Sequence, residues 1–451
     1  MAVTQISVVG LGKLGAVLAA VMADKGLQVV GVDLNPSAVD AINRGEAPVE
    51  ETGLAEMIAR AKTRLKATTN LAEAVAATEA TFIIVPTPSG PDGRFSLDAA
   101  LKACREIGAA LRKKAGFHLV VLCSTVMPGS TGGAVRECLE QASGKRCGED
   151  FGLCYNPEFI ALGSVIRDML TPDVILIGES DQRSGAMLAE IYSRTCENKP
   201  AVQRMNFVNA EITKISVNTY VTTKISYANM LAEVCEQLPG ADVDVVTAAV
   251  GRDSRIGTKY LKGALGYGGP CFPRDNVAFA ALARGLNVDP ALAESTDRVN
   301  KRQVPRLGAL VKQLAPQAKT VAVLGLSYKP ETGVVEESQG VGLAQHLASI
   351  GLRVRVYDPA AMPAARGVLG ASVTYAESPG SCVHGCDAAV ITTPWKEFAT
   401  LMPQDFAGEK KPVLIDCWRM LNGRGFEATT HYVLVGAGQT EAARALSAVE
   451  V

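Results

Sequence analysis

The sequence predicts an α/β protein of two doubly wound domains that are joined by a helical domain with one long helix. Three observations predict this. Short apolar runs alternate with helical patterns through residues 1–205, helical sequence dominates residues 206–316, and the alternation resumes through residues 317–451. We therefore expect three domains with these boundaries.

The first domain contains five nearly continuous apolar runs, which are typical of strands in a parallel sheet that helices cover on both faces. Helical patterns lie between them, for example at Leu14–Lys25 and Asp98–Lys113. The predicted strands are Gln5–Val9, Val29–Asp33, Thr81–Val85, His118–Cys123 and Val174–Ile177.

The middle of the chain predicts one long helix at Asn206–Leu238, because this stretch contains no Pro or Gly. Its apolar residues surround most of the helix, so we expect it to be buried between domains or subunits. The last domain repeats the α/β alternation on a smaller scale, with a helix at Val341–Ser349. Its predicted strands are Thr320–Gly325, Arg353–Tyr357, Ala388–Thr392 and Pro412–Asp416.

The composition excludes several classes of protein. With 45 basic and 46 acidic residues, the chain has no excess charge for general nucleic-acid binding. We expect no membrane span and no secretory signal. Eleven cysteines without a CxxC pair indicate reduced thiols and a cytoplasmic protein. Cys382, His384 and Cys386 lie close together but lack a second ligand pair, so we expect no metal.

A dinucleotide-binding pattern follows the first predicted strand. Gly10, Gly12 and Gly15 form G-x-G-x-x-G where that strand ends and a helix begins, and Asp33 ends the next strand. Gly10 permits a tight turn, Gly12 lets a pyrophosphate approach the backbone, and Gly15 lets the helix pack closely on the sheet. An aspartate accepts hydrogen bonds from a ribose diol and repels a 2′-phosphate, so NAD is favoured over NADP. The last domain lacks these glycines, so a different nucleotide is expected there.

A cysteine surrounded by glycines and prolines is the strongest chemical signal, in the stretch Gly266–Asp275. Such a loop has a fixed, unusual backbone, and the missing side chains let a substrate carbon approach the Cys271 sulfur. Asp275 could place a carboxylate nearby. A lone cysteine is also often a small buried hydrophobe, and the local sequence leaves both interpretations open.

The long helix carries Glu211, Lys214 and Asn218 on one face. A lysine in a mostly apolar helix requires an explanation. One interpretation is an ion pair between Lys214 and Glu211. The other is a cation beside a thiolate or a developing oxyanion, with Asn218 as a further donor.

Together these motifs resemble the UDP-glucose/GDP-mannose 6-dehydrogenase family of nucleotide-sugar dehydrogenases along almost the whole chain. The resemblance rests on the order and spacing of the motifs. Besides the glycine pattern, the helix residues and the cysteine loop, the motifs are Val85–Pro88, Ser124–Gly129, Asn156–Phe159, Arg255–Gly257, Gly325–Pro330 and Tyr357–Pro359.

The resemblance implies two successive NAD-dependent oxidations that convert a primary alcohol to a carboxylate without release of the aldehyde. UDP-glucose is the first expected substrate, and GDP-mannose or another nucleotide sugar is an alternative. The implied catalytic residues are the nucleophile Cys271, the oxyanion donors Lys214 and Asn218, the carboxylates Asp275 and Glu158 that act on water, and Thr125, which holds that water.

The resemblance also implies the two binding sites and a homodimer whose core is the long helix. Arg255 is expected to reach the sugar nucleotide across the dimer interface. The implied cofactor-binding residues are Gly10, Leu11, Gly12, Leu14, Gly15, Asp33, Pro86, Thr87 and Thr125. The implied substrate-binding residues are Glu158, Phe159, Lys214, Asn218, Arg255, Tyr260, Lys262, Gly268, Lys329 and Arg419.

Four residues depart from the family pattern. Leu162 stands where many relatives place a second glutamate, Pro270 replaces a serine, Arg274 replaces a lysine, and Glu336 replaces an arginine. Two other functions therefore stay open. A single-step hydroxyacid or polyol dehydrogenase would have no use for Cys271 or the last domain, and a non-catalytic sugar-nucleotide sensor would bind without reducing NAD.

Overall fold

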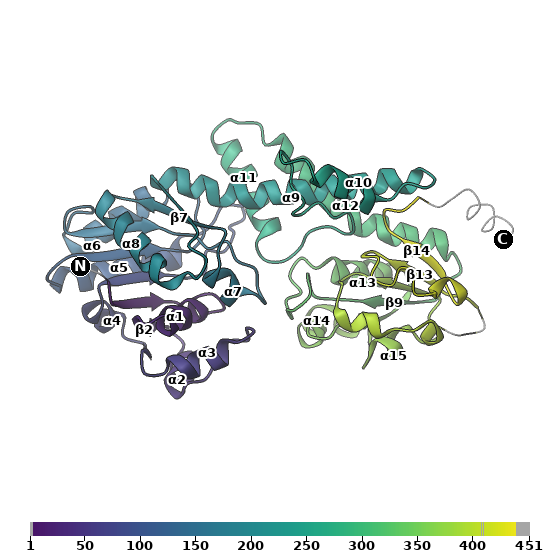
Figure 1. Ribbon diagram of the computed structural model, residues 1–451, viewed down its shortest axis with the longest axis horizontal. Helices are drawn as coiled ribbons and strands as arrows, with labels where there is room; N and C mark the ends of the chain where they lie inside the picture. Colours follow the sequence, from purple (N-terminus) through teal and green to yellow (C-terminus); the bar gives the residue numbers. More distant parts are fainter. Residues whose placement is uncertain (1–2, 407, 409, 439–451) are drawn as a thin grey trace. The chain divides into compact units, whose positions relative to one another are not determined.

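A computed structural model describes residues 3–406, 408 and 410–438, and the chain divides into two compact units, Met1–Val217 and Asn218–Val451 (Figure 1). The division falls within one 31-residue helix, α9 (Phe207–Gln237). Each unit contains one sheet of mainly or wholly parallel strands, and helices α9–α12 lie between the two sheets in the sequence. The predicted fold class is confirmed.

The first unit is built on an eight-stranded sheet of order β3-β2-β1-β4-β5-β6-β7-β8. The strand order reverses between β1 and β4, which is where doubly wound sheets bind ligands. The strands are β1 (Gln5–Val9), β2 (Gln28–Val32), β3 (Leu65–Thr68), β4 (Ala80–Ile83), β5 (His118–Leu122), β6 (Phe151–Tyr155), β7 (Val174–Glu179) and β8 (Ala201–Met205).

Helices cover both faces of this sheet, and each face has its own apolar core (Figure 1). On one face, α1, α3, α7 and α8 pack over β1 side chains such as Ile6 and Val8. On the other, α4, α5 and α6 pack over Val9 and Ile83. The helices are α1 (Gly15–Asp24), α2 (Pro36–Arg44), α3 (Leu54–Ala61), α4 (Leu71–Ala77), α5 (Asp98–Lys113), a π-helical turn (Thr131–Val135), α6 (Arg136–Ser143), α7 (Val165–Leu170) and α8 (Gln182–Thr195).

Two features of this sheet differ from the sequence prediction. Strands β6 and β7 pair antiparallel, whereas the other pairs are parallel. Strands β3, β6 and β8 were not predicted. The five residues of β6 are fully buried but include Gly152, which weakens the β-pattern, and β8 is an exposed edge strand with polar residues.

The second unit begins in α9 and continues with three helices that pack by apolar and ionic contacts. Glu233 on α9 pairs with Arg302 on α12 at 2.8 Å. Pro305 lies within α12, where its missing N–H leaves the carbonyl of Lys301 without the usual helical donor. The helices are α10 (Val243–Gly251), α11 (Phe272–Gly285) and α12 (Ala291–Leu314).

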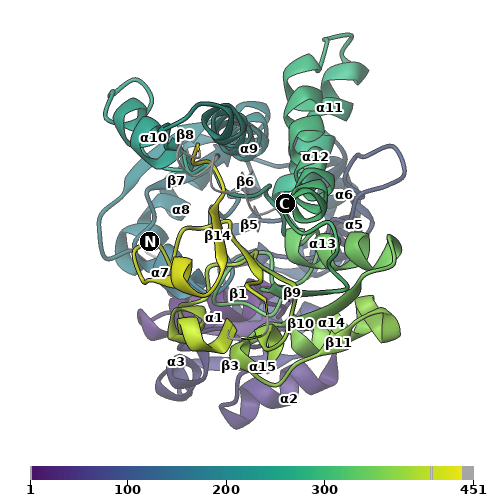
Figure 2. The same cartoon turned by 90° about the vertical axis from the view of Figure 1, so that its right-hand side faces the viewer.

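A six-stranded parallel sheet of order β11-β10-β9-β12-β13-β14 completes the second unit. Alternate residues of β9 point to opposite faces: Val321 and Val323 pack with α12 and α13, while Ala322 and Leu324 pack with α15. Figure 2 shows α13 and α15 on either side of β9. The strands are β9 (Thr320–Leu324), β10 (Arg353–Tyr357), β11 (Thr374–Tyr375), β12 (Ala388–Ile391), β13 (Val413–Asp416) and β14 (His431–Leu434). The helices are α13 (Gln339–Ser349), α14 (Met362–Leu369) and α15 (Pro379–Val383), with 3₁₀ turns at Gly370–Ser372, Lys396–Thr400, Pro403–Phe406 and Phe426–Ala428.

Asp358, at the end of β10, occupies the place that Asp33 has at the end of β2, but its surroundings differ. Its buried carboxylate accepts hydrogen bonds from the backbone N–H groups of Leu326 and Ser327 and from the Trp395 indole. The other oxygen accepts two further backbone N–H groups. Because these internal donors occupy the carboxylate, this sheet has no acceptor here for a ribose diol.

Candidate active site

The glycine-rich turn after β1 has the three steric features that a dinucleotide site requires. Gly10 has φ +95°, and a Cβ atom there would lie 2.1 Å from the carbonyl oxygen of Ile84. A Cβ at Gly15 would lie 1.8 Å from the carbonyl oxygen of Gly10. At Gly12, by contrast, no atom lies within 4 Å of such a Cβ. The first and third glycines are therefore fixed by packing, and the second leaves open space.

Asp33 closes this turn from the end of β2. Its carboxylate accepts the N–H of Leu11 at 2.6 Å and the N–H of Asn35 at 2.8 Å. The carboxylate is half-buried, so it also remains accessible to a ligand. The Leu11 side chain is only 1% exposed and packs in the core, so any contact of Leu11 with a cofactor is made by its backbone. Leu14 packs against the same core.

The predicted residues of the next strands lie together at the carboxyl edge of the sheet. The Thr87 hydroxyl, after β4, donates to the carbonyl of Thr125, after β5, at 2.7 Å. Ser124 links the same two loops by accepting the N–H of Val85 and donating to its carbonyl. Pro86 is exposed. Parallel strands direct these loops to one edge, at the reversal of strand order.

Glu158 follows β6 and is held in a small polar network. The Tyr192 hydroxyl, from α8, lies 3.4 Å from the Glu158 carboxylate and also donates to the side-chain oxygen of Asn156. Burial raises the pKa of Glu158 to about 7, and the charge of Lys214 and the Tyr192 hydroxyl oppose this rise. Glu158 is thus poised to exchange a proton near neutral pH.

Lys214 fixes the same loop from α9. Its ammonium group donates to the backbone carbonyl of Glu158 and lies 4.7 Å from the centre of the Phe159 ring. Lys214 is 8% exposed. Glu211 is fully buried and instead accepts the N–H groups of Gly129 and Thr131, at 2.6 and 2.8 Å. The helix spacing allowed an ion pair between Lys214 and Glu211. In the structure, Glu211 instead binds the backbone of the loop after β5.

In the second unit, Cys271 is the residue that precedes the first turn of α11. It is exposed, and its carbonyl accepts the N–H of Asp275 at 2.8 Å. The Asp275 carboxylate is 1% exposed and accepts the side-chain N–H of Asn218 at 2.6 Å, while Arg274 lies 3.4 Å away. The Asn218–Asp275 hydrogen bond and Cys271 therefore lie at the same end of α11.

The remaining predicted substrate residues lie in varied surroundings. Arg255 has an 86% exposed side chain that pairs with Asp253. Tyr260, at φ +63°, and Lys262 are exposed on the segment before the cysteine loop. Gly268 is buried within that loop, and Lys329 is partly buried.

Arg419 has a structural use in the second unit. Its guanidinium donates to the carbonyls of Val435 and Gly263 and forms an ion pair with Asp244. The side chain is 5% exposed. A contact with a nucleotide would compete with these bonds, and it remains a prediction.

The departures from the family pattern also have visible surroundings. Leu162 packs against the apolar core of the first unit, and the next N–H, of Gly163, donates to the Glu51 carboxylate at 2.9 Å. The Glu336 carbonyl accepts the N–H of Gly269 at 3.0 Å. Sequence reasoning missed Tyr192 as a partner of Glu158, since α8 is remote in sequence and carries no motif.

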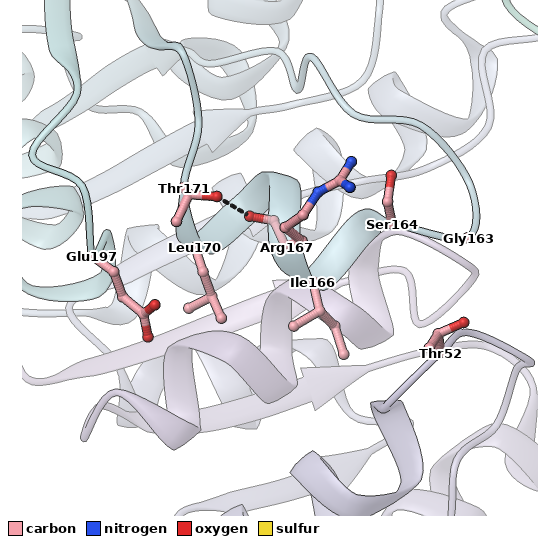
Figure 3. A pocket seen from close by; sticks show the side chains of 8 residues that line it. All are labelled: Thr52, Gly163, Ser164, Ile166, Arg167, Leu170, Thr171 and Glu197. Carbon is pink, nitrogen blue, oxygen red and sulfur yellow. Dashed lines mark hydrogen bonds between the residues drawn. The ribbon is translucent and has the colours of Figure 1, made fainter.

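A cavity of about 400 Å³ lies beside α7 in the first unit, and none of the predicted site residues lines it (Figure 3). Its polar groups bond within the protein: the Thr171 hydroxyl donates to the Arg167 carbonyl, and the Arg167 guanidinium bonds Asp168. The lining residues are Thr52, Gly163, Ser164, Ile166, Arg167, Leu170, Thr171 and Glu197.

Two other features bear on the sequence predictions. Cys382 and Cys386 lie in an apolar core of the second unit. No helix in the described part of the chain could cross a membrane.

The fold and the glycine turn define a dinucleotide-binding protein, and comparisons identify its family. Three family models match consecutively: the NAD-binding, central and UDP-binding domains of the UDP-glucose/GDP-mannose dehydrogenase family, at residues 4–196, 208–302 and 322–423. The chain belongs to this family, and NAD is its cofactor.

Individual relatives agree. The chain is 38% identical to UDP-glucose 6-dehydrogenase AglM of Haloferax volcanii over 93% of this chain and 98% of that protein. It is 37% identical to GDP-mannose 6-dehydrogenase of Azotobacter vinelandii over 78% and 81%. A UDP-glucose dehydrogenase structure from Pyrobaculum islandicum superposes with a TM-score of 0.86 at 36% identity, covering 97% and 98%.

The steric difference between the glycines gives a direct test of the cofactor site. We expect Gly12→Ala to fold normally, because the methyl group meets no protein atom, but to weaken NAD binding by about tenfold or more, because the methyl group occupies the pyrophosphate's path. Calorimetry of NAD binding measures this. Gly15→Ala is the control and should lower the melting temperature instead. Unchanged NAD affinity in folded Gly12→Ala would contradict the assignment.

Proposed function

We propose that this protein oxidises the C6 primary alcohol of a nucleotide sugar to a carboxylate in two NAD-dependent steps, with Cys271 as covalent nucleophile. UDP-glucose is the proposed substrate. The observation that carries the proposal is the arrangement at the start of α11, where an exposed cysteine precedes the helical turn whose buried Asp275 carboxylate accepts the Asn218 amide N–H. The 38% identity to a UDP-glucose 6-dehydrogenase supports it.

The chemistry explains the need for a thiol. When bound, NAD supplies the hydride acceptor for both oxidations. An aldehyde carbon has no hydride to give until a nucleophile adds to it, and the Cys271 thiolate would form that C–S bond, while the carbonyl oxygen gains a proton. The second oxidation leaves a thioester, and water then displaces the sulfur to give the carboxylate and the free thiol.

The proposal gives roles to further groups of the chain. The N-terminus of α11 favours negative charge at Cys271. Lys214 and Asn218 are four residues apart on α9, so they face the same side and would stabilise the oxyanion of the tetrahedral intermediate. Glu158, with a pKa of about 7, would take the proton from the attacking water that Thr125 holds.

The substrate assignment rests on the relatives and on the residues available. Arg255, Tyr260 and Lys262 offer exposed cationic and aromatic groups, and Lys329 offers a cation to the nucleotide from the last domain. Relatives that are named for UDP-glucose and for GDP-mannose have similar identity to this chain. GDP-mannose is therefore the second candidate substrate.

We also propose that the protein is a cytoplasmic homodimer built on α9. None of the eleven cysteines forms a disulfide in the described structure, as in a reducing compartment. The apolar side chains of Tyr220, Tyr227, Met230 and Val234 are 42–63% exposed and share one stripe of α9. An apolar stripe of this kind is stabilised by burial against a second copy.

Replacement of the thiol tests the covalent mechanism. Cys271→Ala should abolish carboxylate formation, since the second oxidation then has no added nucleophile. The native enzyme should release two NADH per carboxylate, measured by absorbance and product chromatography. Cys138→Ala, at a partly exposed cysteine of the first unit, is the control and should keep full activity. Carboxylate formation by Cys271→Ala at the native rate would disprove the mechanism, and one NADH per product would favour a single-step dehydrogenase.

The pH dependence tests the role of Glu158. The rate of carboxylate formation should fall as the pH drops below about 7, because burial raises the pKa of Glu158 to about 7 and the protonated acid cannot accept a proton. Lys214→Met should move this limb to higher pH, because the lysine charge lowers that pKa. A native profile that stays flat between about pH 6 and pH 8 would remove Glu158 as the base.

Charge on the α9 stripe tests the dimer. The double variant Tyr227→Glu, Val234→Glu should convert a native dimer to a monomer, because each carboxylate would be buried without a partner. Sedimentation velocity measures the mass. Val368→Glu, at a 52% exposed position of α14, is the control and should stay dimeric. A monomeric native protein, or a dimeric double variant, would contradict the proposal.

A further inference from the structure

The glycine loop before Cys271 packs tightly against a segment of the last domain. Gly269 has φ +83°, and a Cβ there would lie 2.6 Å from the ring of Tyr328. At Gly268 it would lie 2.3 Å from the carbonyl oxygen of Glu337. The Gly269 N–H donates to the Glu336 carbonyl at 3.0 Å. The glycines are therefore required by this neighbour as well as by any approach of a substrate.

The other end of the loop is held by two side chains. Asn300, on α12, accepts the N–H of Tyr267 at 2.7 Å and donates to its carbonyl at 3.0 Å. The Gln339 amide lies 3.4 Å from the same carbonyl. Between Tyr267 and Cys271, the loop residues Gly268 and Gly269 contact Tyr328, Glu336 and Glu337. The position of Cys271 thus depends on the segment that contains these residues.

This segment, residues 327–338, is itself anchored to the sheet. Asp358 accepts the N–H of Ser327, and the N–H of Tyr328 donates to the Val334 carbonyl at 3.0 Å. Glu331 and Glu337 have positive φ angles of 62° and 50°, which non-glycine residues adopt only when the surroundings hold them there. The segment is a folded loop whose Tyr328 ring faces the glycine loop.

The same segment contains Lys329, whose ammonium lies 5.9 Å from the centre of the Tyr328 ring. A nucleotide phosphate at Lys329 would compete with the ring for this cation. Glycines offer no side chains to hold the loop in place, so a shift of the ring would remove the packing contact of Gly269 and leave the loop held there by the Gly269 N–H bond to Glu336.

We propose that Tyr328 is a positioning residue for the Cys271 thiol and couples nucleotide binding at Lys329 to that thiol. This inference rests on the proposed function for the identity of the nucleotide. The last domain would then do more than hold the substrate: its occupancy would set the geometry of the nucleophile.

The test compares Tyr328→Phe, which keeps the ring, with Tyr328→Leu and Tyr328→Ala, which lose it. We expect the Ala and Leu variants to lose about 10²-fold in kcat, as for a misplaced reacting group, with an unchanged KM for NAD, and the Phe variant to keep near-native kcat. Native-like melting of Tyr328→Leu separates this effect from misfolding.

A second readout is independent of turnover. Peptide mass spectrometry measures the rate at which iodoacetamide alkylates Cys271. This rate should change severalfold when a nucleotide is added to the native protein and to the Phe variant. The nucleotide is UDP, or GDP if calorimetry shows that the native protein prefers GDP. In the Leu and Ala variants this response should vanish although calorimetry still detects the nucleotide. A native response in both ringless variants would overturn the inference. Carboxylate formation by Cys271→Ala would overturn the proposed mechanism, and the alkylation result would still decide the coupling.

Discussion

The hydrogen bond between the Asn218 amide and the Asp275 carboxylate is the interaction on which the catalytic half of the second unit depends. A carboxylate that is 1% exposed is costly unless donors reach it, and Asn218 reaches it at 2.6 Å from α9. This bond fixes the first turn of α11 to the long helix. Cys271 precedes that turn, so this bond holds the C-terminal side of the cysteine, and the packed glycine loop holds its N-terminal side.

The first unit depends on the direction of its strands. Strands β1, β4, β5 and β6 run parallel, so the loops that contain Gly10, Thr87, Thr125 and Glu158 emerge at one edge of the sheet. Lys214 then holds the Glu158 loop from α9 by its carbonyl and by the Phe159 ring. A cation that is buried for this structural reason is also close enough to lower the pKa of Glu158, which burial raises. Lys214 therefore both holds the loop in place and lowers the pKa of the Glu158 carboxyl.

The sequence predicts those parts of the protein that depend on local pattern. The glycine turn, the long helix without Pro or Gly, and the cysteine loop each carry their signal within about ten to thirty residues. The Glu211 carboxylate illustrates the limit: helix spacing offered Lys214 as its partner, but the folded chain brings backbone N–H groups from 80 residues away. Tyr192 beside Glu158, the antiparallel β7 and the Arg419 contacts are long-range in the same sense, and no local pattern encodes them.

In the proposed mechanism the substrate becomes bonded to the Cys271 sulfur as an acyl group. The most direct measurement is intact-protein mass spectrometry after acid quenching during turnover with UDP-glucose and NAD, followed by peptide mapping. The covalent mechanism predicts an added mass of the nucleotide-sugar acyl group on the peptide that contains Cys271, and the loss of this mass on treatment with hydroxylamine. Steady formation of carboxylate with no adduct, or an adduct on another cysteine, would contradict it.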